Sequence, residues 1–142
     1  MNKNNLMELR FEAHPENESF ARMVISAFLV QNNPSLNTIS EVRTAVSEAV
    51  TNAIVHAYRE KQQGIVVMRA QIREGLLSVE IEDFGCGIPD IEQAMQPFYT
   101  SQPEAERTGI GFALMQSFMD KVSVSSAISG GTCVQMLKRL CP

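Results

Sequence analysis

The stretch that decides the fold reads Ser47-Glu48-Ala49-Val50-Thr51-Asn52-Ala53-Ile54-Val55-His56. It extends an apolar stripe with a period near 3.6 residues that begins at Ile39, and it therefore predicts an amphipathic helix. Glu48, Asn52 and His56 are spaced four residues apart, so they form one polar edge beside that stripe. Two glycine-containing stretches follow in the chain: Asp83-Phe84-Gly85-Cys86-Gly87-Ile88-Pro89 and Thr108-Gly109-Ile110-Gly111.

The composition predicts one globular domain over residues 1–142, because 44% of the residues are hydrophobic. A net charge of −4 predicts no direct contact with nucleic acid, which requires a basic surface. No apolar run approaches the roughly 20 residues that cross a bilayer, and the polar N-terminus has no signal region. Three cysteines without a Cys-x-x-Cys pair favour a reduced, cytoplasmic protein without a membrane segment.

The hydrophobic pattern predicts an α+β fold with helices on one face of a mixed sheet. The first helix opens at Pro15, with apolar residues at helical spacing from Phe20 and Met23 onward. The second opens at Thr38-Ile39-Ser40-Glu41, which matches a capping box, and fades by Gly64. The expected strands and last helix are Leu6 to Phe11, Ile65 to Arg73, Leu76 to Glu82 (after a Glu74-Gly75 turn), the helix Gly111 to Lys121, Val122 to Ser126, and Thr132 to Arg139.

The Glu48–Asn52 pair is the first candidate for chemistry. A glutamate on a helix surface is most often only solvated, but asparagine is a mediocre helix former, and two polar groups at a core boundary suggest a ligand. An asparagine carbonyl suits Mg²⁺, which takes its other ligands from water and phosphate. A carboxylate one turn away suits proton abstraction from a hydroxyl or water. His56 is interpreted as a packing residue or dipole partner, outside the site.

Asp83 follows a predicted strand and precedes two glycines. It is either a polar turn residue or a carboxylate that accepts a hydrogen bond from the exocyclic amine of adenine. In the second interpretation, Gly85 and Gly87 let the backbone pack close to the base, and guanine is rejected because it carries a carbonyl there. Asp83-Phe84-Gly85 also imitates a protein-kinase motif, but the chain has neither a His-Arg-Asp loop nor the length for two kinase lobes.

The stretch Gly109-Ile110-Gly111 opens a predicted helix, whose free N–H groups suit phosphate oxygens. Arg107 lies just upstream and is suited to a terminal phosphate. The segment from Gln96 to Pro103 then forms a lid, or remains an ordinary surface loop. Thr132 is a weaker candidate, since threonine at a strand entry usually reflects β-propensity. The chain has no Walker A sequence and no nucleophile elbow.

These motifs resemble the GHKL ATPase superfamily over nearly the whole chain. Residues 47–53 resemble its N box, residues 83–87 its G1 box and residues 108–112 its G2 box. The resemblance implies a two-layer α/β sandwich of the Bergerat type, with a mixed, mainly antiparallel sheet and an ATP lid. Residues 16–22, 47–52, 87–92 and 118–120 further resemble the sporulation anti-sigma factors of endospore-forming bacteria.

This second resemblance implies a serine-protein kinase that forms a homodimer, binds and inhibits sigma factor F, and phosphorylates an anti-anti-sigma factor. It makes Glu48 the catalytic base and Asn52 the magnesium ligand. Glu18 and Arg22 would belong to the surface that both protein partners use. The ATP/ADP site would comprise Asn52, Asp83, Gly85, Gly87, Thr100 in the lid, Arg107 at the terminal phosphate, Thr108, Gly109, Gly111 and Thr132.

Two departures from the family pattern and three alternatives remain. Cys86 lies between the glycines, and His56-Ala57-Tyr58 replaces a His-Gly-Tyr pattern. The alternatives are a general-stress anti-sigma factor with kinase activity, a binding module that uses ATP only structurally, and a detached histidine-kinase catalytic domain.

Overall fold

Five strands form one sheet in the computed structural model, which describes residues 3–57, 64–85, 111–127 and 130–140. The strands are β1 (Asn5–Glu12), β2 (Ile65–Arg73), β3 (Leu76–Asp83), β4 (Lys121–Ala127) and β5 (Gly131–Arg139). Their order is β1-β2-β3-β5-β4, and every neighbouring pair is antiparallel. The expectation of a mixed sheet is corrected on this point, because the β4–β5 hairpin returns β5 beside β3 in the antiparallel direction.

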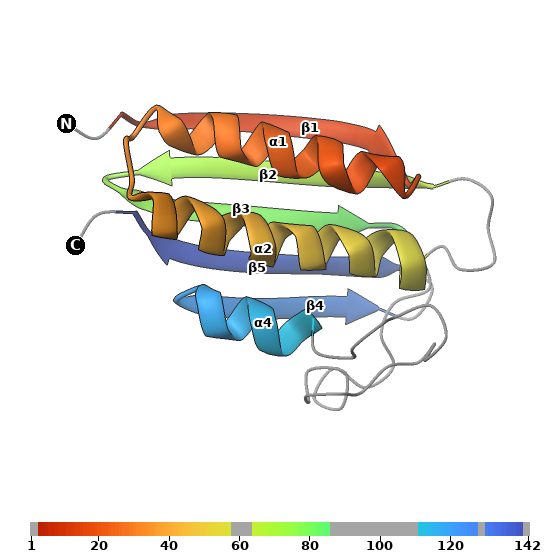
Figure 1. The fold of residues 1–142 in the computed structure, drawn as a ribbon. Coiled ribbons are helices and arrows are strands. Elements are labelled where there is room, and N and C mark those ends of the chain that lie inside the picture. The colour runs from red at the N-terminus through yellow and green to blue at the C-terminus, as the bar shows by residue number, and fades with distance from the viewer. Residues whose placement is uncertain (1–2, 58–63, 86–110, 128–129, 141–142) are drawn as a thin grey trace.

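The helices cover one face of this sheet, as expected for a two-layer α+β sandwich (Figure 1). They are α1 (Glu16–Val30), α2 (Leu36–Asn52) and α4 (Gly111–Phe118), and a π-helical turn, η1 (Ala53–Ala57), follows α2. Helix α2 lies between the other two and packs against both. None of the helices in the described ranges is long and apolar enough to cross a membrane.

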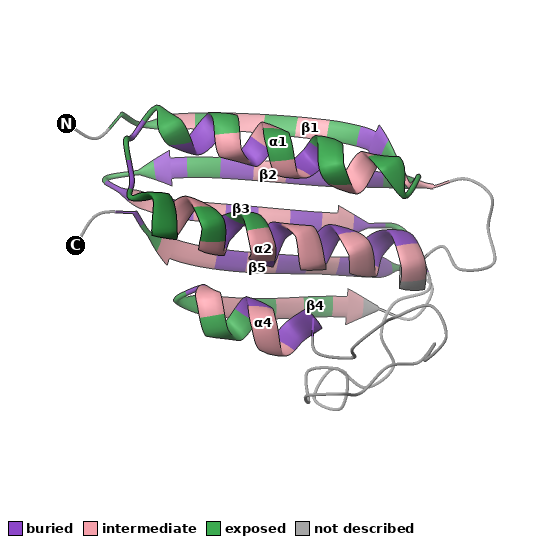
Figure 2. Cartoon of the chain, viewed as in Figure 1, coloured by how far each residue is buried: buried purple, intermediate pink, exposed green. Residues whose placement is uncertain are grey.

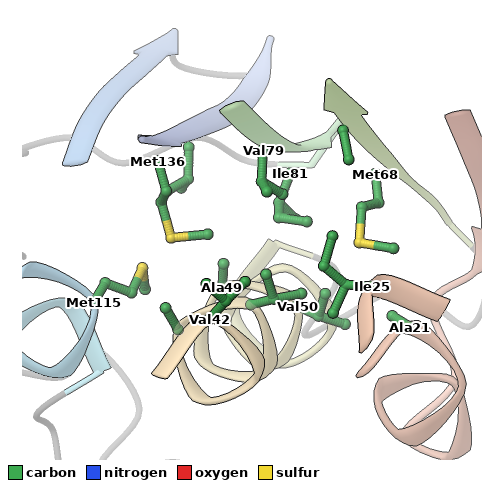
Figure 3. Packing of buried hydrophobic residues seen from close by; sticks show 14 of the residues in the cluster. Ala21, Ile25, Val42, Ala49, Val50, Met68, Val79, Ile81, Met115 and Met136 are labelled. Carbon is green, nitrogen blue, oxygen red and sulfur yellow. The ribbon is translucent and has the colours of Figure 1, made fainter. Parts of the chain in front are cut away.

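The core lies between the helices and the sheet. Ile25, Val42 and Val50 point from α1 and α2 toward Met68, Val79, Ile81 and Met136 on the strands (Figure 3). All of them are almost completely buried. Burying one such side chain stabilises the fold by about 1.5–3 kcal/mol, so this layer contact is the main source of stability.

Strand β3 shows how the sheet pattern places a functional residue. Leu77, Val79 and Ile81 are buried and face the helices, as the alternation in the sequence predicts. Because successive side chains point to opposite faces of a strand, Asp83 is the next residue on the inward side. The turn before β3 is also confirmed, since Glu74 and Gly75 both have positive φ angles, of 51° and 78°. Paired positive φ angles are typical of a type I′ hairpin.

The exposed and buried faces of α1 differ from the simplest interpretation of its apolar residues. The helix buries Ala21, Ile25, Phe28 and Leu29, whereas Phe20 and Met23 are 47% and 69% exposed. Apolar residues surround much of this helix, so helical spacing alone does not select the buried face. The small Ala21 side chain faces the core, where it allows close packing.

The predicted start of α2 is wrong by three residues, because the capping box placed the N-cap at Thr38. The N-cap is Ser35, whose Oγ accepts a hydrogen bond of 3.1 Å from the N–H of Thr38. Glu41 does not complete a capping box and instead pairs with Lys138, at 3.2 Å between Oε1 and Nζ. Because the helix begins at Leu36, Thr38 lies inside it and cannot be the N-cap of a capping box with Glu41.

Of the other predicted helix ends, the end of α2 near Gly64 is not tested, and the end of α4 is earlier than predicted. The α-helical part of α2 ends at Asn52 and continues as the π-helical turn to Ala57, and residues 58–63 lie outside the described part. Helix α4 ends at Phe118, because Lys121 already belongs to β4.

We expect Ser35→Ala to lower the free energy of unfolding by about 1 kcal/mol, the usual effect of losing an N-cap side chain. Thr38→Ala keeps the N–H that is capped and removes only the contact between the two hydroxyls, so it should lower stability less. Urea denaturation of both variants measures the difference. A larger loss for Thr38→Ala would restore Thr38 as the cap.

Candidate functional site

Three segments that are distant in sequence lie at one end of the sandwich (Figure 1). They are the last turn of α2, the end of β3 and the beginning of β5. Asp83 is directly opposite Thr132 in the β3–β5 ladder. Helix α4 packs against α2, and its first residue is on the side nearer this end. The structure therefore brings four of the predicted site residues to the same end, namely Asn52, Asp83, Gly85 and Thr132, and Gly111 begins the helix beside them.

Asp83 is a buried carboxylate held by the backbone. The residue is 5% exposed, and its Oδ1 accepts hydrogen bonds from the N–H groups of Gly85 at 3.0 Å and Thr132 at 3.3 Å. Burial raises the pKa of Asp83, while these two hydrogen bonds act in the opposite direction. Both bonds end on Oδ1, so the carboxylate has a fixed orientation.

Gly131 allows the strands to approach each other at this carboxylate. Its φ is +90°, and a Cβ built on it would lie 2.1 Å from the carbonyl oxygen of Asp83. Only glycine tolerates both conditions, so this residue permits the close contact between β3 and β5. The next residue, Thr132, is 8% exposed, and its Oγ1 lies 3.0 Å from Oγ of Ser126. Sequence reasoning placed Gly131 only in the turn of the closing hairpin, although the Gly130-Gly131 pair before a strand is also a signal for such an approach.

Glu48 and Asn52 lie on α2, one helical turn apart, as predicted. Both are half-buried, beside the buried Ala49 and Val50. The polar edge of the helix therefore borders the core at the end where Asp83 lies. A π-helical turn begins directly after Asn52. Such turns are rare and frequently occur at functional sites, because they change the direction in which side chains leave the helix.

Glu18 and Arg22 are linked to the same part of α2. Ser47 donates a 2.6 Å hydrogen bond from Oγ to Oε2 of Glu18, and Nε of Arg22 lies 3.5 Å from the same oxygen. Ser47 immediately precedes Glu48. The two residues assigned to a partner surface by resemblance are therefore fixed next to the proposed catalytic glutamate.

The remaining predicted residues are divided between the described and undescribed parts of the chain. Gly111 is buried as the first residue of α4. Gly87, Thr100, Arg107, Thr108 and Gly109 lie outside the described residues, as does Cys86. Their roles remain predictions.

The structure also shows a hollow that sequence reasoning missed. It has a volume of about 210 Å³ and lies between α1 and α2. The lining residues are Arg22, Ser40, Arg43, Thr44, Ser47 and Glu48. Ser40, Thr44 and Glu48 are spaced four residues apart, so extending the polar edge of α2 backward from Glu48 would have indicated this surface.

The fold and the three motif regions define a class of protein, namely ATP-binding domains built as a two-layer sandwich without a P-loop. Residues 11–138 match the family of histidine kinase-like ATPase domains. Among solved structures, the catalytic domain of the histidine kinase ThkA is similar with a TM-score of 0.61 and 13% identity, covering 97% of both chains. The RsbU and RsbW domains of a Mycobacterium tuberculosis protein give a TM-score of 0.71 at 18% identity, covering 96% of this chain and 32% of that one. At these identities the structures establish the fold alone.

Sequence relatives identify the branch of the family. The anti-sigma F factor of Geobacillus stearothermophilus is 47% identical over 137 residues, covering 96% of this chain and 94% of that protein. The anti-sigma F factor of Caldanaerobacter subterraneus subsp. tengcongensis is 49% identical and covers 97% and 96%. The chain belongs to the histidine kinase-like ATPase domain family and, within it, to the anti-sigma F factors.

We expect Asp83→Asn to stabilise the unliganded protein at neutral pH by about 0.5–2 kcal/mol, as do other substitutions that relieve a functional constraint. The raised pKa means that the folded state holds the proton more tightly than the unfolded chain. The ionised carboxylate therefore lowers stability, and this penalty grows as the pH rises from 3.8 through the raised value.

Urea denaturation of wild type and Asp83→Asn between pH 3 and pH 8 tests this expectation. The two stability curves should converge at the acidic end and separate toward neutral pH. A constant difference, or a variant that is less stable at neutral pH, would contradict the assignment of Asp83 as a desolvated carboxylate.

Proposed function

We propose that the protein is an ATP-dependent serine-protein kinase that also binds and inhibits sigma factor F. Its substrate is the anti-anti-sigma factor, which it phosphorylates on serine. The observation that carries the proposal is that Glu48 and Asn52, toward the end of α2, and Asp83, the last residue of β3, belong to the same end of the fold, in a chain 45–49% identical to anti-sigma F factors.

Asp83 is the residue proposed to recognise the base. The two backbone N–H groups on Oδ1 orient the carboxylate, so Oδ2 is the atom that accepts a hydrogen bond from the exocyclic amine of adenine. In this proposal Gly85 and Thr132 lie next to the base, because the N–H groups of both residues bind Asp83. We assign the phosphates to the start of α4 at Gly111, where free N–H groups favour anions. Gly87, Thr100, Arg107, Thr108 and Gly109 complete this ATP/ADP site in the proposal.

Asn52 is the residue proposed to hold Mg²⁺. Its amide oxygen is a hard donor of the type that this ion prefers, and it lies half-buried at the last residue of α2. Among the described residues, His, Cys, Asp and Glu side chains form no group of three that suits a metal. The remaining ligands would therefore be phosphate oxygens and water. When bound, the ion neutralises charge on the phosphate oxygens.

Glu48 is the proposed general base for phosphoryl transfer. The serine oxygen of the substrate forms a bond to the γ-phosphorus, the bond from that phosphorus to the bridging oxygen of ADP breaks, and Glu48 accepts the hydroxyl proton. Because such reactions depend mainly on positioning, the stiffness of α2 matters as much as the carboxylate itself. The neighbouring Ser47–Glu18 hydrogen bond restrains this part of the helix.

Glu18 and Arg22 are proposed to contact sigma factor F and the anti-anti-sigma factor. They lie on the side of α1 that faces α2, linked to Ser47 as described above. A partner that binds there therefore also adjoins Glu48. Since both partners act in transcription, we place the protein in the cytoplasm. Its net charge of −4 favours protein partners over direct contact with nucleic acid.

The opposite side of α1 is proposed to form a homodimer. Phe20, Met23 and Val30 are 47%, 69% and 56% exposed. Figure 2 shows that the exposed residues of α1 lie on the side of the helix that faces away from the sheet. Exposed apolar side chains on one face of a helix favour contact with another copy of the chain.

We expect Glu48→Gln to reduce phosphorylation of the anti-anti-sigma factor by about 100- to 10,000-fold, the usual contribution of a general base. Binding of ATP and of sigma factor F should persist. Glu74→Gln, in the β2–β3 turn, is the matched control and should retain full transfer.

Transfer is measured with labelled ATP, and an acid-stable product distinguishes phosphoserine from phosphohistidine. Normal transfer by Glu48→Gln would remove this residue from the mechanism. An acid-labile product would instead favour a histidine-kinase-like activity.

We expect Met23→Lys to weaken self-association by about tenfold or more, because it places a charge in an apolar contact. Gln71→Lys, on the exposed face of β2, adds the same charge away from α1 and should not change the dimer. Sedimentation equilibrium gives the dissociation constant of each variant. Equal dissociation constants for the two variants would exclude this face as the dimer interface.

A further inference from the structure

The hollow between α1 and α2 has the composition of a site for an anion. Arg22 lines it from α1, and Ser40, Arg43, Thr44, Ser47 and Glu48 line it from α2. Two guanidinium groups and three hydroxyls are all hydrogen-bond donors for a carboxylate or phosphate. The volume of about 210 Å³ accommodates a side chain rather than a nucleotide.

The two arginines of the hollow differ in whether a carboxylate of the described residues neutralises their charge. Arg22 pairs with Glu18, which also accepts the hydrogen bond from Ser47. Arg43 is exposed and forms no ion pair with a carboxylate of the described ranges. The net charge of the chain is −4, so Arg43 is a local positive charge on an acidic protein. Arg43 is therefore the cation of the hollow that an anionic group of another molecule can neutralise.

The position of the hollow relates it to the proposed reaction. Ser40, Thr44 and Glu48 follow one another at intervals of one helical turn, so they line a single face of α2. The axial distance from Arg43 to Glu48 is about 7.5 Å, from a rise of 1.5 Å per residue. A protein that presents a hydroxyl to Glu48 thus covers Arg43 with an adjacent part of its surface.

We propose that this hollow binds an acidic side chain of the protein substrate, through Arg43 and the hydroxyls of Ser40 and Thr44. The proposal rests on the kinase function proposed above and adds a determinant of substrate recognition. A carboxylate is the occupant that fits better than a phosphate group, because the Glu48 carboxylate at the other end repels a doubly charged group more strongly. The phosphorylated product therefore gains no contact here, and its release is not hindered.

The first test compares Arg43→Glu with Arg10→Glu. Both substitutions change the net charge by the same amount at an exposed arginine, and Arg10 lies on β1, away from the hollow. We expect Arg43→Glu to raise the KM for the anti-anti-sigma factor about tenfold, as expected for reversing a charge at an interface, with little change in kcat. The KM for ATP should be unchanged. Arg10→Glu should resemble wild type, and Arg43→Lys should restore most of the lost recognition.

The second test is a charge exchange. Acidic surface residues of the anti-anti-sigma factor are changed to lysine one at a time, and each variant is assayed with wild type and with Arg43→Glu. One lysine variant should be a poor substrate for wild type and a better one for Arg43→Glu. Equal KM values for Arg43→Glu and Arg10→Glu, with no such exchange, would overturn the proposal while leaving the kinase function intact. Absence of transfer by wild type would overturn both.

Discussion

The carboxylate of Asp83, held inside the sandwich between β3 and β5, is the interaction on which the site depends. A buried charge is unfavourable unless hydrogen bonds compensate it, and here the N–H groups of Gly85 and Thr132 supply that compensation. They also fix the strand ends, since both donors are backbone groups. The close approach permitted by Gly131 belongs to the same arrangement. The same hydrogen bonds to Asp83 therefore hold the ends of β3 and β5 together and orient the carboxylate that is proposed to recognise the base.

The helical layer places the chemistry relative to this carboxylate. Helix α2 lies between α1 and α4, so its buried side is fixed by apolar contacts from three directions. Its polar edge consequently has a defined orientation, with Asn52 at the end near Asp83 and Glu48 one turn earlier. Closer to the N-terminus of α2, the same edge lines the hollow that contains Arg43. One helix thus connects the proposed metal ligand, general base and substrate-recognition residues.

Most of this arrangement follows from local sequence patterns. The alternation in β3 predicts that Leu77, Val79 and Ile81 face the core. The four-residue spacing on α2 predicts that Glu48 and Asn52 share an edge. Two local predictions failed. Ser35 caps α2 in place of Thr38, so Glu41 lies inside the helix and pairs with Lys138. The side of α1 that carries Ala21 packs against the core, so Phe20 is exposed. The Glu18–Ser47 hydrogen bond spans 29 residues, a distance that no local pattern reveals.

The most direct test of this account is the relative affinity for ATP and GTP, measured by isothermal titration calorimetry with Mg²⁺ present. Asp83 as the base-recognising residue predicts saturable binding of ATP and binding of GTP that is weaker by about 100-fold or more, because the guanine carbonyl leaves a buried carboxylate without its donor. Equal affinities, or no saturable binding of ATP, would contradict the account.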